Sequence, residues 1–145
     1  MRYNDTVMDH FLNPRNAGPL PNANAVGRAG SGDCGDLVEL SLRVEDDRVV
    51  EARFRAFGCV AAIAGASVTT ELVRGRTVAE ALALTNTDVV HALGGLPPRK
   101  VECSILAEEA IRAALGAYLE RNRPADRLPT DAPAAENPPA APDQP

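Results

Sequence analysis

Two stretches of the chain alternate between apolar and polar side chains. The alternation runs over residues 38–45 and again over residues 50–56, and the polar pair Asp46–Asp47 lies between them. An apolar residue at every second position is typical of a β-strand with one buried face. The sequence therefore predicts an antiparallel hairpin with one face toward solvent, and no third strand is evident.

Apolar positions in the other regular segments follow helical spacing. The first helix should end before Asn13–Pro14, because a residue that precedes proline is pushed out of the helical region. Thr77 with Glu80 three residues later indicates a capping box. The expected helices are one up to Leu12, one from Cys59 to Arg74, a short one after Thr77, one over Asp88–Leu93, and an amphipathic one from Ser104 to about Arg121. This order predicts an α+β fold, in which helices pack on one face of a small antiparallel sheet.

Two segments show no such periodicity. The stretch from Ala17 to Gly35 is rich in Gly, Asn, Pro and Ser, which predicts a mobile loop that carries Cys34. Residues 122–145 contain seven prolines and almost no large apolar side chains. Such a composition cannot bury enough surface to become ordered. We therefore expect one domain over residues 1–121, followed by a disordered Pro/Ala-rich tail over residues 122–145.

Charge and cysteine content narrow the class of protein. The net charge is −5 and the chain has no basic block, which argues against a nucleic-acid partner. No apolar run is long enough for a membrane span or a signal peptide, so a cytoplasmic protein without membrane partners is expected. Three cysteines far apart in the sequence do not form a disulfide framework in a reducing compartment. They are either buried small apolar residues or functional thiols.

The positions of the thiols suit metal binding. Cys59 and Cys103 are expected at helix N-termini, where the macrodipole favours an anion and can lower a thiol pKa. Cys34 lies in a turn with Asp36, so three thiolates and one carboxylate could complete a four-coordinate site. The spacings, however, with 24 and then 43 intervening residues, match no zinc-finger or ferredoxin pattern. Taken alone, the thiol pattern leaves both readings open.

Four segments together resemble one known family. They are DHFLNPRNAG (9–18), DCGD (33–36), FGCVAAIAGAS (57–67) and LPPRKVECSILAEEAI (96–111). Their order and the spacing of the cysteines are similar to the iron–sulfur scaffold family of IscU and the N-terminal domain of NifU, over residues 1 to about 121. The resemblance implies a scaffold that is not an enzyme, and that assembles a transient [2Fe–2S] cluster from iron and sulfur and transfers it.

The resemblance also implies roles for individual residues. Cys34, Cys59 and Cys103 match the family's cysteine ligands, and Asp36 matches its aspartate. Cys103 is similar to the thiol that accepts persulfide sulfur, a step that suits an accessible thiolate of low pKa. Asp36 adds a hard oxygen ligand beside soft thiolates, which keeps the cluster exchangeable.

One position departs from the family pattern. Glu102 stands where the family has a histidine directly before the third cysteine. Either Glu102 competes with Asp36 as the oxygen ligand, or Asp36 acts alone, and we favour Asp36. His10 and His91 are expected to be surface or packing residues.

The family also implies partners. These are a cysteine desulfurase, a frataxin-like iron donor, an Hsp70-type chaperone with its co-chaperone, and acceptor apo-proteins, around a monomer or a transient dimer. The chaperone contact would use residues 96–100, in which Arg99 replaces an apolar residue, and Tyr3 matches a tyrosine in a segment associated with self-association. Two alternatives stay open. One is a zinc-bound relay that passes persulfide from Cys103 without cluster assembly, and the other is a paralogue that only binds a desulfurase.

Overall fold

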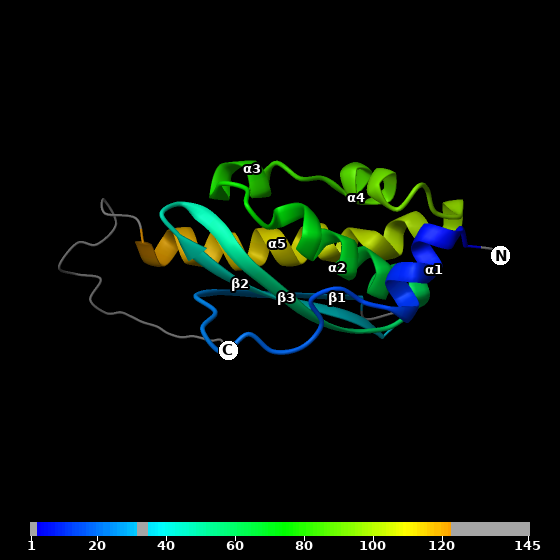
Figure 1. The fold of residues 1–145 in the computed structure, drawn as a ribbon, viewed down its shortest axis with the longest axis horizontal. Helices are drawn as coiled ribbons and strands as arrows, with labels where there is room; N and C mark the ends of the chain where they lie inside the picture. The colour runs from blue at the N-terminus through cyan, green and yellow to red at the C-terminus, as the bar shows by residue number, and fades with distance from the viewer. Residues whose placement is uncertain (1–2, 32–34, 123–145) are drawn as a thin grey trace.

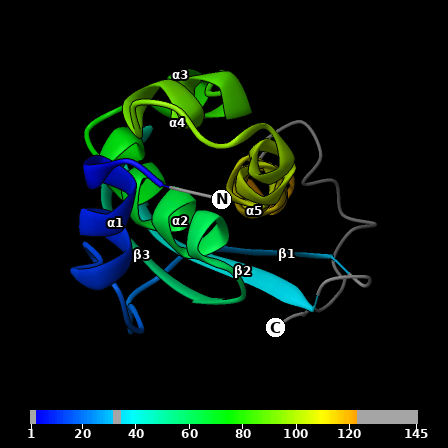
Figure 2. The ribbon, with the colours of Figure 1, turned by 90° about the vertical axis from the view of Figure 1, so that its right-hand side faces the viewer.

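A computed structural model of the chain describes residues 3–31 and 35–122. These residues form a three-stranded antiparallel sheet in the order β1-β2-β3. The strands are β1 (Ala25–Ser31), β2 (Asp36–Glu45) and β3 (Arg48–Phe57). The helical elements are α1 (Asp5–Leu12), α2 (Val60–Val73), α3 (Val78–Leu82), α4 (Asn86–Ala92), the 3₁₀ turn η1 (Pro98–Lys100) and α5 (Val101–Asn122). All helices lie on one side of the sheet, which confirms the expected α+β fold class (Figure 1, Figure 2).

The hairpin predicted from the alternating pattern is present as β2 and β3. Asp46 and Asp47 both have positive φ values, 51° and 65°. Two consecutive positive φ values are typical of a type I′ turn, whose twist matches that of the flanking strands. Leu40 and Leu42 of β2 are fully buried beneath the helices, as their place in the alternation requires.

The segment before Cys34 differs from the expectation. Residues 25–31 were predicted to belong to a mobile loop, but they form β1, which pairs with β2 over its whole length. Four of the seven residues of this strand are glycine or alanine. Such small residues give no alternation of large apolar and polar side chains, so the sequence pattern did not indicate a strand. The reason for the small residues is close packing: a Cβ on Gly27 would lie 2.3 Å from the backbone nitrogen of Ala114 in α5.

The chain before β1 is also tied to the sheet. The Phe54 N–H donates to the Asn16 carbonyl at 3.0 Å, and the Gly18 N–H donates to the Phe54 carbonyl at 2.9 Å. This part of the predicted loop therefore follows the outer edge of β3. The predictions for Cys34 and for residues 123–145 of the expected tail (122–145) fall outside the described residues, and Asn122, the first residue of that tail, is the last residue of α5.

The helix predictions hold, with shifted boundaries. α1 ends at Leu12, α2 begins directly after Cys59, and the capping box of Thr77 and Glu80 is formed. α5 begins at Val101, so Cys103 lies within its first turn rather than before it. Among the residues that the structure describes, no helix is long and apolar enough to cross a membrane.

Two apolar clusters hold the layers together. One joins the sheet to α2 and α5, and the other joins α1, α2 and α4 through residues such as Val7, Val68 and Leu93. α2 takes part in both, and it is buried nearly all round because Ala, Gly, Ser and Thr make up most of it. Small side chains let the sheet and the neighbouring helices approach α2 closely, so its position is tightly fixed.

Candidate metal centre

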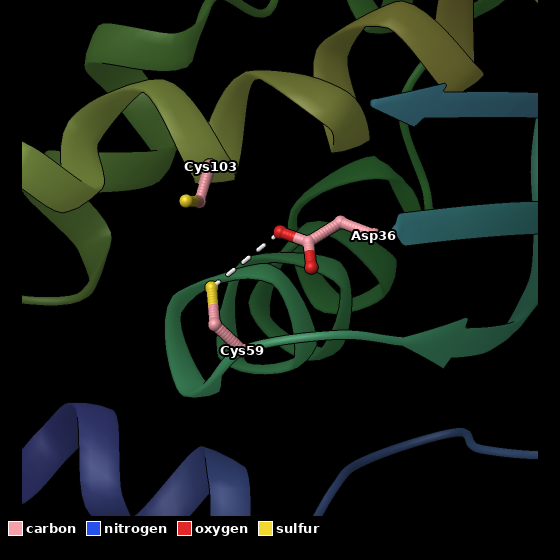
Figure 3. A group of neighbouring side chains, drawn as sticks. All are labelled: Asp36, Cys59 and Cys103. Carbon is pink, nitrogen blue, oxygen red and sulfur yellow. Dashed lines mark hydrogen bonds between the residues drawn. The ribbon is translucent and has the colours of Figure 1, made fainter. Parts of the chain in front are cut away.

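The ends of three elements meet at one edge of the domain. Asp36 is the first residue of β2, Cys59 is the N-cap of α2, and Cys103 lies in the first turn of α5. A carboxylate oxygen of Asp36 and the two sulfur atoms all lie within 4.8 Å of one another. Figure 3 shows the three side chains converging from their separate elements. The fold thus brings together three of the residues that the sequence analysis selected.

Asp36 lies between the Cys59 thiol and the backbone of Gly58, the residue that follows β3. Asp36 is only 6% exposed, and the Cys59 thiol donates a hydrogen bond to Asp36 Oδ2 at 3.6 Å. Gly58 has a φ of +143°, and a Cβ at this position would lie 2.3 Å from Asp36 Oδ1. Only glycine combines this backbone conformation with that space. Gly58 therefore forms the wall against which the carboxylate rests.

Cys103 does not have the low pKa that was expected for a thiol at a helix N-terminus. Burial is the main cause that raises the pKa of Cys103, to about 11, and its interaction with Cys59 adds to the rise. A nearby Lys100 acts in the opposite direction. In the metal-free domain, desolvation therefore outweighs the helix terminus, and Cys103 is held as a neutral thiol.

Two residues near the thiols were not selected as site residues from the sequence. The thiolate of Cys59, followed by that of Cys103, raises the pKa of Lys100. Burial raises the pKa of Tyr3, Lys100 lowers it, and both cysteines act on it as well. Tyr3 packs against the cluster formed by α1, α2 and α4. One sequence signal pointed to Lys100: it is the only lysine of the chain, and it precedes Cys103 by three residues.

The remaining candidate ligands are not part of this group. Cys34 lies outside the described residues, although Gly35 and Asp36 directly follow it. Glu102 is exposed, and its carboxylate is not within the 4.8 Å group formed by Asp36, Cys59 and Cys103. Of the two oxygen ligands considered, the structure brings only Asp36 to the thiols.

The histidines have separate positions. His10 is 6% exposed, and its Nδ1 lies 2.8 Å from Ser67 Oγ, which also accepts the Arg15 N–H at 2.9 Å. His10 is thus a packing residue that ties α1 to α2. His91 is exposed on α4.

The donor set suits a soft or borderline metal. Two ligands of a tetrahedral zinc with metal–sulfur bonds of about 2.3 Å lie about 3.8 Å apart. The three ligand atoms within 4.8 Å are therefore close to the geometry that one ion requires. Two thiols select zinc or iron, and the carboxylate supplies a harder and weaker ligand. The residues present fit such an ion, or an iron–sulfur cluster as cargo.

Comparisons with a family profile and with known sequences lead to the same family, and a comparison with solved structures gives the same fold. The profile of the family described as "NifU-like N terminal domain" matches residues 2–125. The chain is 45% identical to the iron–sulfur cluster assembly scaffold protein IscU 1 of Archaeoglobus fulgidus over 126 residues, which cover 87% of this chain and 82% of that protein. It is 45% identical to the IscU scaffold protein of Escherichia coli K12 over 122 residues, which cover 81% of this chain and 94% of that protein. A solved NifU-like N-terminal protein from Brucella abortus shares the fold, with a TM-score of 0.65, 19% identity, and coverage of 82% of this chain and 94% of that one.

Proposed function

This chain belongs to the family of NifU-like N-terminal domains, and from that premise we propose that it is a scaffold for de novo assembly of [2Fe–2S] clusters. In this proposal, iron and desulfurase-derived sulfur are combined at Asp36, Cys59 and Cys103, with Cys34 as a further thiolate. The finished cluster is then passed to acceptor proteins. The relatives named as iron–sulfur cluster assembly scaffold proteins support the general scaffold role.

The observation that carries the proposal is the convergence of one carboxylate and two thiols within 4.8 Å. Each ligand comes from a different element, so the site is preformed by the packing of β2, α2 and α5. A carboxylate binds iron less firmly than a thiolate, which suits a cluster that must leave. Cys59 and Cys103 are both partly exposed, so a delivered sulfur or an acceptor protein has access.

The same donor set supports a second candidate, the zinc-bound persulfide relay. Zinc accepts cysteine and aspartate ligands in tetrahedral sites. In the relay, zinc would occupy the thiols between sulfur transfers, and Cys103 would accept and pass sulfur without any cluster. The two candidates use the same residues and differ in the product.

Partners are part of the proposal. The desulfurase and an iron donor would approach the open side of the site at Cys59 and Cys103. The segment proposed to bind an Hsp70-type chaperone begins with Leu96, which packs against the α1–α2–α4 cluster, and continues into η1. An Hsp70 that grips an extended peptide would therefore have to unwind η1, directly before the turn that carries Cys103.

The test is anaerobic reconstitution with iron, cysteine and a catalytic amount of desulfurase, followed by visible spectra and by iron and sulfide counts. Wild-type protein and the variants Cys34→Ser, Cys59→Ser and Cys103→Ser are compared. Charge-transfer bands in the wild type that all three substitutions abolish support the scaffold. A colourless zinc-containing protein with persulfide on Cys103 would instead identify the relay.

A further inference from the structure

Lys100 occupies an unusual place among the basic residues. It is the only lysine of the chain, and the other fourteen cationic side chains are arginines. It is the last residue of η1, which runs directly into α5. Residues three positions apart on a helix lie on the same side, with Cβ atoms about 5–6 Å apart, so Lys100 and Cys103 are neighbours.

Among the residues that the structure describes, the groups that act most on the charge of Lys100 belong to the site or lie beside it. The residue is half-buried, and it forms no ion pair with a carboxylate of residues 3–31 or 35–122. The groups that raise the pKa of Lys100 are Cys59, then Cys103, Tyr3 and Asp36. An ammonium without a fixed carboxylate partner is available to pair with an anion that forms at the thiols.

We propose that Lys100 is a positioning residue for sulfur, whose ammonium attracts the sulfur anion on Cys103 and holds it beside Cys59 and Asp36. This inference rests on the proposed function, because it concerns the sulfur that such a scaffold receives. A lysine suits the task because its ammonium is a compact point charge on a flexible stem, which can follow a sulfur atom that moves.

The transfer step shows where the charge arises. The Cys103 thiol first releases its proton to solvent, and the resulting thiolate attacks the outer sulfur of a donor persulfide, R–S–SH. A sulfur–sulfur bond forms to Cys103, the donor's sulfur–sulfur bond breaks, and its electron pair leaves on the donor as R–S⁻. The product Cys103–S–SH then releases its proton to solvent and becomes an anion. Negative charge is shared among three sulfur atoms during the exchange, so a cation placed beside them in advance favours the step.

The chain offers a matched control next to Lys100. Arg99 carries the same charge in the same 3₁₀ turn, but it is exposed and does not number among the groups that shift the pKa of Cys103. Replacing Arg99 changes the charge of the segment to the same extent as replacing Lys100. A difference between the two variants therefore reports position and not net charge.

The experiment uses the full chain, metal-free and anaerobic, with cysteine persulfide as the sulfur donor. The rate of persulfide formation on Cys103 is followed by alkylation and mass spectrometry. Lys100→Met should slow this rate about tenfold. We expect the ammonium to stabilise the negative charge on the sulfur atoms by the equivalent of about one pKa unit, which is a factor of ten. Lys100→Arg should stay within about twofold of the wild type, because it keeps the charge, and Arg99→Met should leave the rate unchanged.

Two results would overturn the proposal. One is an unchanged rate in Lys100→Met, and the other is an equal loss in Lys100→Met and Lys100→Arg, which would mean that the shape of the lysine and not its charge matters. The cobalt(II)–thiolate spectrum of each variant checks that the ligands are still assembled, and Lys100→Gln replaces Lys100→Met if the latter does not fold. No desulfurase, chaperone or iron is present, so a failure of cluster assembly in the wild type would count against the proposed function and not against this role of Lys100.

Discussion

The thiol of Cys59 donates a hydrogen bond to Asp36 Oδ2 across the end of the sheet, over 3.6 Å. Cys59 is the N-cap of α2 and Asp36 is the first residue of β2, so this contact joins the two elements at the site. A thiol that donates to a carboxylate is protonated, whereas a thiolate ligand is not. If Cys59 and Asp36 hold a metal as proposed, this bond would have to break and the thiol would have to release its proton, and Asp36 would change from an acceptor of Cys59 into a ligand.

The proposed lability of the cluster depends on Asp36. Asp36→Ala should lengthen the lifetime of an assembled cluster in a transfer assay with an apo-ferredoxin acceptor, because the weakest ligand is lost and exchange through it stops. The control is Glu109→Ala, which removes an exposed carboxylate of α5. An unchanged or shorter lifetime in Asp36→Ala would contradict the assigned role.

Gly58 should be needed for the position of Asp36. Gly58→Ala places a Cβ 2.3 Å from Asp36 Oδ1 at a φ of +143°, and we expect a loss of about 3 kcal/mol in the free energy of unfolding together with weaker cobalt(II) binding. Gly75→Ala is the matched control, because Gly75 has a φ of +86° and nothing lies within 4 Å of its added Cβ. It should cost about 1–2 kcal/mol and leave metal affinity unchanged. Equal effects of both variants on the cobalt(II) spectrum would show that Gly58 has no special relation to Asp36.

Close packing of β1 on α5 predicts a stability effect far from the thiols. Gly27→Ala should lower the free energy of unfolding by about 1–3 kcal/mol, because the new Cβ meets the backbone of Ala110 and Ala114. Urea denaturation measures this loss. Gly116→Ala in α5, where nothing lies within 4 Å, should instead stabilise the domain by about 0.5–1 kcal/mol. If Gly27→Ala were as stable as the wild type, β1 would not lie this close to α5.

His10 should make stability depend on pH. Burial is the main cause that lowers the pKa of His10, with Arg15 acting in the same direction and Glu71 and Asp9 opposing it. The unfolded chain then binds more protons than the folded one, so stability is complete above about pH 6.5 and is lost as the pH falls toward the folded pKa of His10. Urea denaturation between pH 7.5 and 5 should show this decline. His10→Gln should remove it while His91→Gln keeps it, and a decline that survives in His10→Gln would assign it to other groups.

The raised pKa of Cys103 can be tested through its reactivity. At pH 8 the metal-free domain should alkylate slowly at Cys103, with a rate that climbs as the pH approaches about 11. Cys59→Ala should raise the rate at pH 8, because Cys59 is the second cause of the high pKa after burial. Peptide mapping after iodoacetamide treatment assigns the modified thiol. Fast alkylation of wild-type Cys103 at pH 8 would show that the helix terminus and Lys100 outweigh burial after all.

Local chemistry determined several parts of this protein from the sequence alone. The alternation over residues 38–56 determined the hairpin, and Pro14 and the capping box after Thr77 determined where two helices end and begin. Each of these signals acts over a few residues, so it is readable without the rest of the chain. The resemblance to the family, and not the cysteine spacing by itself, predicted that Cys34, Asp36, Cys59 and Cys103 belong to one site, and the structure brings the last three together.

Tertiary packing decided what those local signals could not. β1 pairs with β2 and lies against α5 at Gly27, although the small residues that this contact requires have little strand preference of their own. The pKa of Cys103 is high because packing removes it from part of the solvent and places it beside Cys59. The three-residue spacing along the chain places Lys100 beside Cys103, but only packing brings it near Cys59 as well. Burial and distance between side chains arise only when the elements pack, so the chemistry of this site belongs to the tertiary structure.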